Sequence, residues 1–153
     1  MDIIDSNTKN QSNAFFLNII ILGDAGTLEC QDQSGNEKVV GTITGANLRY
    51  FDYLRGQWRY RTYLNATAKN EYKSWWRGWE LKNTSALEMV INVNYSYGGT
   101  SGSSNVRVHT GGNLFKVIGY NFFDTGWQQT NFGGFYSNGS ITFSGRSGTS
   151  CIL

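Results

Sequence analysis

Residues 87–97 read Leu-Glu-Met-Val-Ile-Asn-Val-Asn-Tyr-Ser-Tyr, and this stretch is the clearest sign of the fold class. Its odd-numbered positions are all apolar or aromatic, whereas its even-numbered positions are polar apart from Val90. Alternation with a period of two is typical of a β-strand that has one face in a core and the other in water. Antiparallel sheets commonly leave one face solvated. We therefore predict an antiparallel strand over Leu87–Tyr97 whose odd-numbered side chains are buried.

Further strands are predicted from alternation and from β-branched and aromatic residues. They are Phe15–Leu22, Lys38–Thr44, Asn47–Leu54, Gln57–Leu64, Tyr72–Leu81, Asn105–His109, Leu114–Phe123 and Ser140–Ser144. The chain has no proline, so Gly, Asn, Asp and Ser must build the turns between them. We predict a hairpin loop at 32–36, a flexible loop at 98–104, and tight turns at 111–113 and 138–139.

Many short strands without sustained helical periodicity predict an all-β fold. We expect a single-domain antiparallel β-sandwich that is jelly-roll-like, with a closed β-barrel as the alternative. A chain of 153 residues suits one domain with a sizeable core. We place that domain at residues 14–153 and expect the polar residues 1–13 to form a flexible N-terminal arm.

Charge is distributed unevenly along a chain whose net charge is only +2. Residues 49–82 hold eight basic and three acidic residues, which gives 8 − 3 = +5, and the rest of the chain carries 5 − 8 = −3. The same segment holds ten aromatic residues. Nucleic-acid binding driven by phosphate contacts needs a larger positive charge. We therefore expect no specific nucleic-acid partner.

Neither a membrane span nor a secretion signal is visible in the sequence. No apolar run approaches the roughly 20 residues of a membrane helix, and the N-terminus lacks the basic start of a signal peptide. Localisation stays unknown, with the cytoplasm and export by a non-classical route both open. Contact with a membrane surface also stays open, whereas a transmembrane segment is not expected.

The two cysteines, Cys30 and Cys151, lie near opposite ends of the chain. Without a sign of an oxidising compartment, we expect two free thiols. The alternative is a disulfide, which would close so long a loop that the chain-entropy model assigns it about 4–5 kcal/mol.

Groups that could support catalysis are scarce. The single histidine, His109, is predicted on a solvated strand face, and two distant cysteines with one histidine make a poor zinc site. We expect Glu80 and Glu88 to be surface carboxylates, although a glycosidase pair stays open. The oxygens of 32–37 lack the spacing of a calcium loop and fit a solvated hairpin. We predict no enzyme activity, no catalytic residue, no metal and no cofactor.

Tryptophans beside polar groups are the best candidates for binding. Trp127 lies in a turn-like segment with Asp124 and Gln128. A sugar ring needs an aromatic surface for its C–H face and directional hydrogen bonds for its hydroxyls. We therefore predict Trp127, Asp124 and Gln128 as ligand-binding residues. The alternative is that Trp127 plugs the end of the sandwich.

A second group of candidates comes from the predicted strand Tyr72–Leu81. Alternation places Trp75, Arg77 and Trp79 on one side of it, and we add these three residues to the predicted site. The alternative is that Trp75 and Trp79 belong to the core, with Arg77 reaching its edge.

The segment from Val90 through Trp127 resembles jelly-roll carbohydrate-binding modules in general pattern. It contains a Val-Asn-Tyr strand, a Val-Arg-Val strand and then Thr-Gly-Trp. Such a module would be a non-catalytic sugar binder. The pattern covers about a quarter of the chain and does not identify a family.

We therefore expect a non-catalytic, lectin-like protein that binds glycans through surface Trp and Tyr side chains and polar loop residues. Shallow sugar sites gain strength through multivalency, so a homo-oligomer is expected. One alternative is a structural subunit of a virion, a phage tail or another assembly, in which aromatic residues would form subunit contacts. The other is a membrane-binding cytolysin, with Trp and Tyr at the level of the headgroups.

Overall fold

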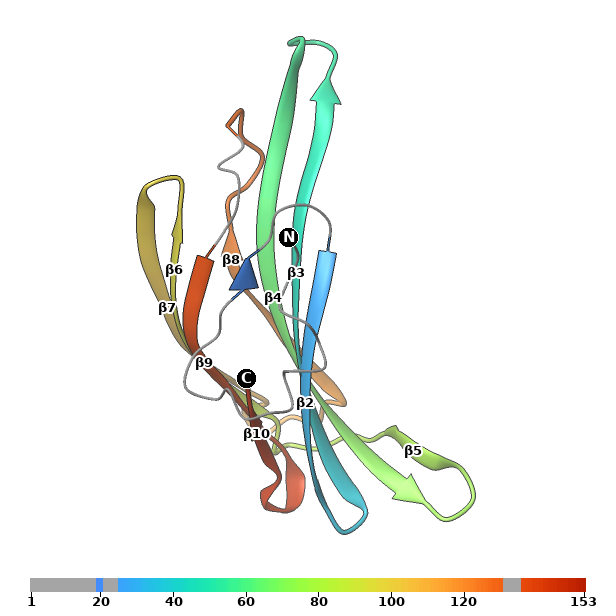
Figure 1. Cartoon of the computed structure of the whole chain (residues 1–153). Helices are drawn as coiled ribbons and strands as arrows, with labels where there is room; N and C mark the ends of the chain where they lie inside the picture. The colour runs from blue at the N-terminus through green and yellow to red at the C-terminus, as the bar shows by residue number, and fades with distance from the viewer. Residues whose placement is uncertain (1–18, 21–24, 131–135) are drawn as a thin grey trace.

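A computed structural model of the chain describes residues 19–20, 25–130 and 136–153. The described strands form an elongated sandwich of two five-stranded antiparallel sheets (Figure 1). This confirms the predicted all-β sandwich. The strands form two separate sheets, so the alternative of a closed barrel is not realised. The predicted arm 1–13 and most of the predicted strand Phe15–Leu22 lie outside the described residues.

The first sheet has the strand order β1-β9-β6-β7, and β10 also pairs with β9. Its strands are β1 (Ile19–Ile20), β6 (Glu88–Tyr97), β7 (Thr100–His109), β9 (Tyr136–Ser144) and β10 (Ser150–Ile152). The second sheet has the order β2-β3-β4-β5, and β8 also pairs with β4. Its strands are β2 (Ala25–Ser34), β3 (Glu37–Asp52), β4 (Gln57–Ser74), β5 (Gly78–Leu81) and β8 (Val117–Asp124).

Among the described strands, the chain crosses between the sheets at four connections, which are β1–β2, β5–β6, β7–β8 and β8–β9. Strands β2 to β5 form a meander within the second sheet, and β6 and β7 form a hairpin in the first. The chain then returns to the second sheet for β8 and to the first for β9 and β10, which follow one another across the short 3-10 helix η1 (Arg146–Gly148). Short hairpins therefore build most of each sheet, and the crossings join the two sheets.

The core lies between the sheets, and β6 contributes to it as predicted. Leu87, Met89, Ile91 and Val93 are buried, while Asn92 and the other even-numbered positions are more exposed. The second sheet faces them with its own buried side chains, which include Leu28, Val39, Ile43, Leu64, Ala66 and Ala68. Burial of these apolar side chains is the main force that holds the two sheets together.

Strand β3 is longer than predicted. The segments Lys38–Thr44 and Asn47–Leu54 were expected to be two strands, but β3 runs unbroken through Gly45 and Ala46. These two residues pair with Leu64 and Tyr63 of β4. The long partner strand holds these two small residues in extended conformation, as tertiary context can.

The predicted strand Tyr72–Leu81 is wrong, because the segment is a hairpin. Strand β4 ends at Ser74, the turn covers 75–77, and β5 starts at Gly78. Gly78 has a φ of 77°, in the left-handed region that glycine adopts without steric cost. Trp75, Arg77 and Trp79 therefore do not share one face of a single strand.

Two predicted loops are also shorter than expected or absent. Residues 100–104 of the predicted flexible loop belong to β7 and pair with β6, so only Gly98 and Gly99 remain in the turn. The predicted tight turn Asn138–Gly139 lies inside β9, opposite β6. Turn-forming residues do not by themselves end a strand when a neighbour completes its hydrogen bonds. The turns at 35–36 and 111–112 lie where they were predicted.

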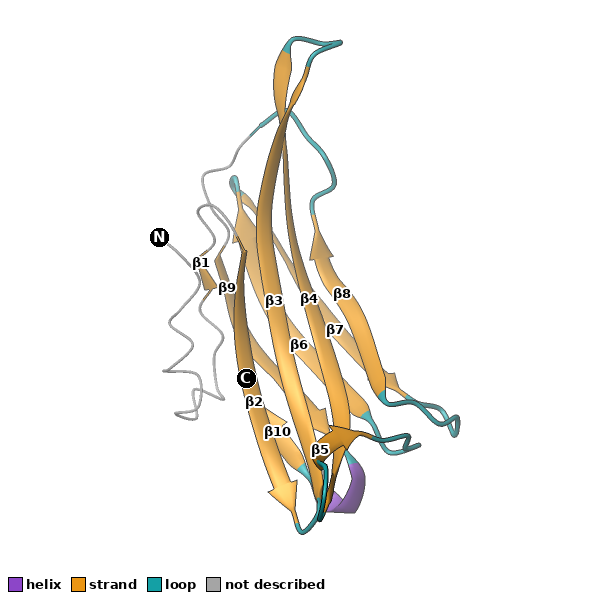
Figure 2. Cartoon of the chain, turned by 90° about the vertical axis from the view of Figure 1, so that its right-hand side faces the viewer, coloured by secondary structure: helices purple, strands orange, loops and turns teal. Residues whose placement is uncertain are grey.

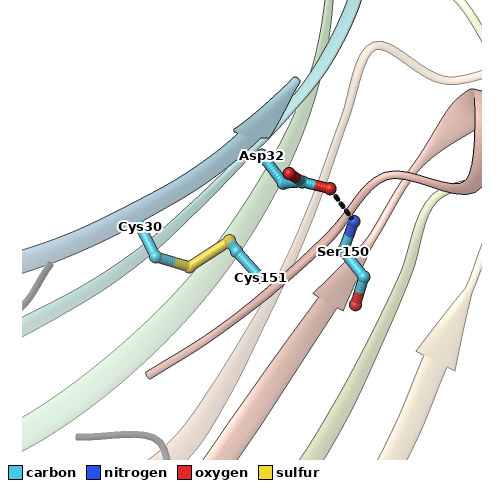
Figure 3. Close-up of a disulfide and its surroundings, with 4 residues drawn as sticks. All are labelled: Cys30, Asp32, Ser150 and Cys151. Carbon is cyan, nitrogen blue, oxygen red and sulfur yellow. Dashed lines mark hydrogen bonds between the residues drawn. A yellow bond between two sulfur atoms is a disulfide. The ribbon is translucent and has the colours of Figure 1, made fainter. Parts of the chain in front are cut away.

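A disulfide joins Cys30 to Cys151, so the expectation of free thiols was wrong (Figure 3). Their Cα atoms are 6.0 Å apart although 121 positions separate them in sequence. Strand β10 folds back along β9, which brings Cys151 across from β2 of the other sheet. Beside the disulfide, the backbone N–H of Ser150 donates a hydrogen bond of 2.9 Å to Asp32. The bridge therefore ties the C-terminal strand to the second sheet.

Candidate functional site

The outer face of the second sheet is a regular polar surface that the strand register defines. We define it as the odd-numbered residues of β4 together with their cross-strand partners, since paired residues share one face of a sheet. One row across it reads Thr27, Thr44, Asn65 and Asn121, and the next reads Glu29, Thr42, Thr67 and Gly119. The even-numbered side chains Leu64, Ala66 and Ala68 point into the core instead. Hydroxyl and amide groups therefore cover the middle of the outer face.

An aromatic pair lies at one end of this face. The rings of Tyr50 and Trp127 meet edge to face, with centroids 4.7 Å apart. Trp127 is 43% exposed, so it does not plug the sandwich. Tyr50 pairs with Arg59 across the hairpin and thus belongs to the outer face. We call Tyr50, Arg61, Asp124 and Trp127 the Trp127 cluster.

Asp124 is held by Arg61 within this cluster. The Arg61 Nε donates to Asp124 Oδ1 at 2.9 Å, and Arg61 Nη2 donates to Oδ2 at 2.5 Å. The Gly126 N–H adds a third hydrogen bond, at 2.8 Å to Oδ1. The Arg61 hydrogen bonds, followed by that of Gly126, lower the pKa of Asp124. These three hydrogen bonds use most of the acceptor capacity of the carboxylate. We therefore assign Asp124 the role of holding Arg61 in place.

Backbone contacts fix the loop that carries Trp127. Gln128 forms a two-way backbone bridge with Tyr60, with N···O distances of 2.9 and 2.8 Å. The backbone N–H of Thr62 donates to Thr125 Oγ1 at 3.0 Å. The backbone of Gln128 therefore forms these contacts, and they hold Trp127 against the edge of β4.

The other predicted tryptophans lie at the β4–β5 hairpin. Trp75 is on the turn and is 95% exposed. Trp79 lies on β5 opposite Lys73, and Lys38 Nζ is 4.4 Å from the centroid of its ring. The Arg77 guanidinium lies 4.1 Å from the ring centroid of Trp76, which the sequence analysis had not singled out.

The predicted residues therefore form two groups and not one compact site. Tyr60, which bridges to Gln128, and Lys73, which faces Trp79, are 73 − 60 = 13 residues apart on β4. At about 3.3 Å per residue, this separation is about 43 Å. Both Trp127 and Trp79 border the outer face, at opposite ends, whereas Trp75 lies on the turn beyond the end of β4.

Tyr50, Arg61 and the polar rows between the two ends were not predicted from the sequence. Alternation partly indicated that Thr42 and Thr44 face outward, because these residues lie one position away from the buried Ile43. The pairing of Thr44 with Asn65 depends on the register between strands, which a single sequence does not show.

Groups considered for catalysis make structural contacts. Arg107 donates hydrogen bonds of 2.8 and 2.6 Å to Glu88. His109 Nδ1 accepts a hydrogen bond from the Gly111 N–H at 3.0 Å. Within the described ranges, no group of three or more His, Cys, Asp or Glu side chains could hold a metal ion.

Comparisons with protein-family models, with curated proteins and with solved structures found no match. In the part of the chain that the structure describes, no helix is long and apolar enough to cross a membrane.

Proposed function

We propose that the protein binds glycans without catalysis, and that a glycan chain lies on the outer face of the second sheet with one sugar ring against the Trp127 cluster. The observation that carries this proposal is the exposed Tyr50–Trp127 pair at the end of polar rows on the same face. Stacking and directional hydrogen bonding are the two interactions that sugars need, and both are available side by side.

The aromatic pair supplies the stacking surface. Indole and phenol rings attract the apolar C–H face of a sugar, and although the edge of one ring lies against the face of the other, Tyr50 and Trp127 each stay 43% exposed. Arg61, fixed by Asp124, presents further donor groups on the same face. A fixed guanidinium loses less conformational freedom on binding than a mobile one.

The amide pair Asn65 and Asn121 supplies hydrogen bonds further along the face. Asn121 Nδ2 donates to Asn65 Oδ1 at 2.7 Å. This bond uses one of the two hydrogens of Asn121 and one lone pair of Asn65, so both amides keep capacity for sugar hydroxyls. Thr44 adjoins Asn65 in the same row.

A glycan array with two matched pairs of variants tests the proposal. Trp127→Ala should weaken binding at least about tenfold through lost stacking. Trp75→Ala removes an equally large and more exposed indole away from the outer face, and it should change nothing. Asn65→Ala should weaken binding, whereas Asn94→Ala should not, because Asn94 makes a comparable amide pair with Asn138 on the other sheet.

Thermal unfolding must show that each variant is folded. Loss of binding in Trp75→Ala equal to that in Trp127→Ala would contradict the assigned site. A folded wild-type protein that binds no glycan on a broad array would overturn the proposal and leave the assembly subunit as the next hypothesis.

A further inference from the structure

The hairpin formed by β3 and β4 extends well beyond the rest of both sheets (Figures 1 and 2). Over the residues that the structure describes, β3 pairs with β2 as far as Ala46, and β4 pairs with β8 as far as Tyr63. Among the described residues, the strand pairs of 48–59 are all within the hairpin itself. The loop that carries Trp127 reaches Tyr60, which pairs with Arg49. Beyond this bridge, the three positions from Arg49 to Asp52 give the projecting end a length of about 10 Å. We call residues 48–59 the hairpin tip.

Large apolar side chains are exposed at the very end of the hairpin tip. Leu54 is 100% exposed and Tyr53 is 88% exposed, and Trp58 behind them is 47% exposed. Isolated two-stranded ribbons are marginally stable in water, and exposed apolar groups clustered at one place commonly mark an interaction surface. The sandwich core needs none of these side chains.

Contacts inside the hairpin tip hold its shape without a partner. The Phe51 ring meets Tyr53 and Trp58 edge to face, with centroids 4.9 and 5.5 Å apart. Asp52 forms ion pairs with Arg55 at 2.9 Å and with Arg59 at 3.6 Å. The exposed apolar end is therefore presented on an ordered base.

The hairpin tip is also positively charged. It contains three arginines and one aspartate, so its charge is 3 − 1 = +2. The hydrogen bond from the Arg55 side chain lowers the pKa of Asp52, so this carboxylate stays ionised and neutralises only one of the two guanidinium groups that it meets. The Arg49 guanidinium lies 5.6 Å from the ring centroid of Trp58.

We propose that the hairpin tip binds the headgroup region of membranes that contain anionic phospholipids. Leu54 and Tyr53 enter the boundary between headgroups and acyl chains, and Trp58 lies at headgroup level, where Trp and Tyr are enriched. Arg49 and Arg55 bind lipid phosphates, since guanidinium groups pair well with phosphate oxygens. The lipid-binding residues differ from those of the proposed glycan face, which meets the hairpin tip at Tyr50, and they need no sugar on the lipid.

The β4–β5 turn at the opposite end is the strongest competing surface. It also exposes Trp75 and Trp76, but Arg77 covers the Trp76 ring and lies 3.7 Å from Glu80. Residues 71–80 hold two basic and two acidic residues, which gives a charge of zero. Charge complementarity with anionic lipids therefore favours the hairpin tip.

Sedimentation with sugar-free vesicles tests the proposal. The full chain should bind vesicles of phosphatidylcholine and phosphatidylserine more tightly than vesicles of phosphatidylcholine alone. Leu54→Asn should weaken binding at least about tenfold, because Leu burial is lost. Arg55→Gln should weaken it about fivefold through the loss of one charge near the membrane surface. Neither change should lower the melting temperature by more than a few degrees, since both side chains are exposed.

Two control variants make the outcome decisive. Trp75→Ala should bind vesicles like the wild type, and Trp127→Ala should also bind them while losing glycans. Leu54→Asn should keep glycan binding, so the two proposals can fail separately. The lipid proposal is overturned if the wild type does not bind vesicles that contain phosphatidylserine, or if Trp75→Ala loses as much vesicle binding as Leu54→Asn.

Discussion

At the scale of single residues, neighbouring positions of β6 differ in burial because they lie on opposite faces of the sheet. Ile91 is fully buried and Asn92 is exposed. Ile91→Asp should unfold the protein, because an unpaired charge in the core costs several kcal/mol. Asn92→Asp should be nearly neutral. Urea unfolding of both variants checks this, and equal effects would contradict the facing of the strand.

The Arg61–Asp124 pair predicts a pH-dependent effect of Asp124→Asn. The pKa of Asp124 in the folded state lies below its ordinary value of 3.8, so the ionised form stabilises the fold. That contribution is fully present near pH 7 and is lost as the pH falls through the lowered pKa. Because the pair is partly exposed, we expect Asp124→Asn to cost about 0.2–1 kcal/mol at pH 7. Urea unfolding should show the wild type and the variant converging in strong acid, and a constant difference at all pH values would exclude the ion pair as its cause.

At the scale of strands, two glycines of the second sheet differ in what surrounds them. A Cβ atom on Gly41 would overlap the ring of Phe143 from the other sheet, whereas on Gly119 the nearest atom would be 3.6 Å away. Gly41→Ala should therefore destabilise by about 1–3 kcal/mol through overpacking. Gly119→Ala should be close to neutral. Chemical denaturation measures both, and similar values would show that the sheets can move apart at Gly41.

At the scale of the whole molecule, the disulfide links the C-terminal strand to the second sheet. Replacing Cys30 and Cys151 by Ser should lower stability by up to about 4–5 kcal/mol in the chain-entropy model. A reducing agent should destabilise the wild type by a similar amount and leave the double variant unchanged. Equal stability of wild type and double variant would show that packing alone holds β10. The homo-oligomer stays a prediction, which analytical ultracentrifugation can test.

The sequence by itself determined the strand class and the facing of β6, and it favoured a two-sheet sandwich over a closed barrel. These properties follow from local alternation, which needs no knowledge of distant residues. It left open whether Trp127 and Trp75 lie at the surface or in the core, and the structure exposes both. Their membership in a functional site stays a prediction.

Only the tertiary structure decided which distant residues meet. Strand register placed Asn65 beside Asn121 and Arg61 beside Asp124, and the return of β10 brought Cys151 to Cys30. It also separated Trp127 from Trp79 along the length of β4. The physical reason is that cross-strand pairing depends on hydrogen bonds and packing between segments far apart in the chain. A pattern along one strand carries no information on which residue lies opposite it.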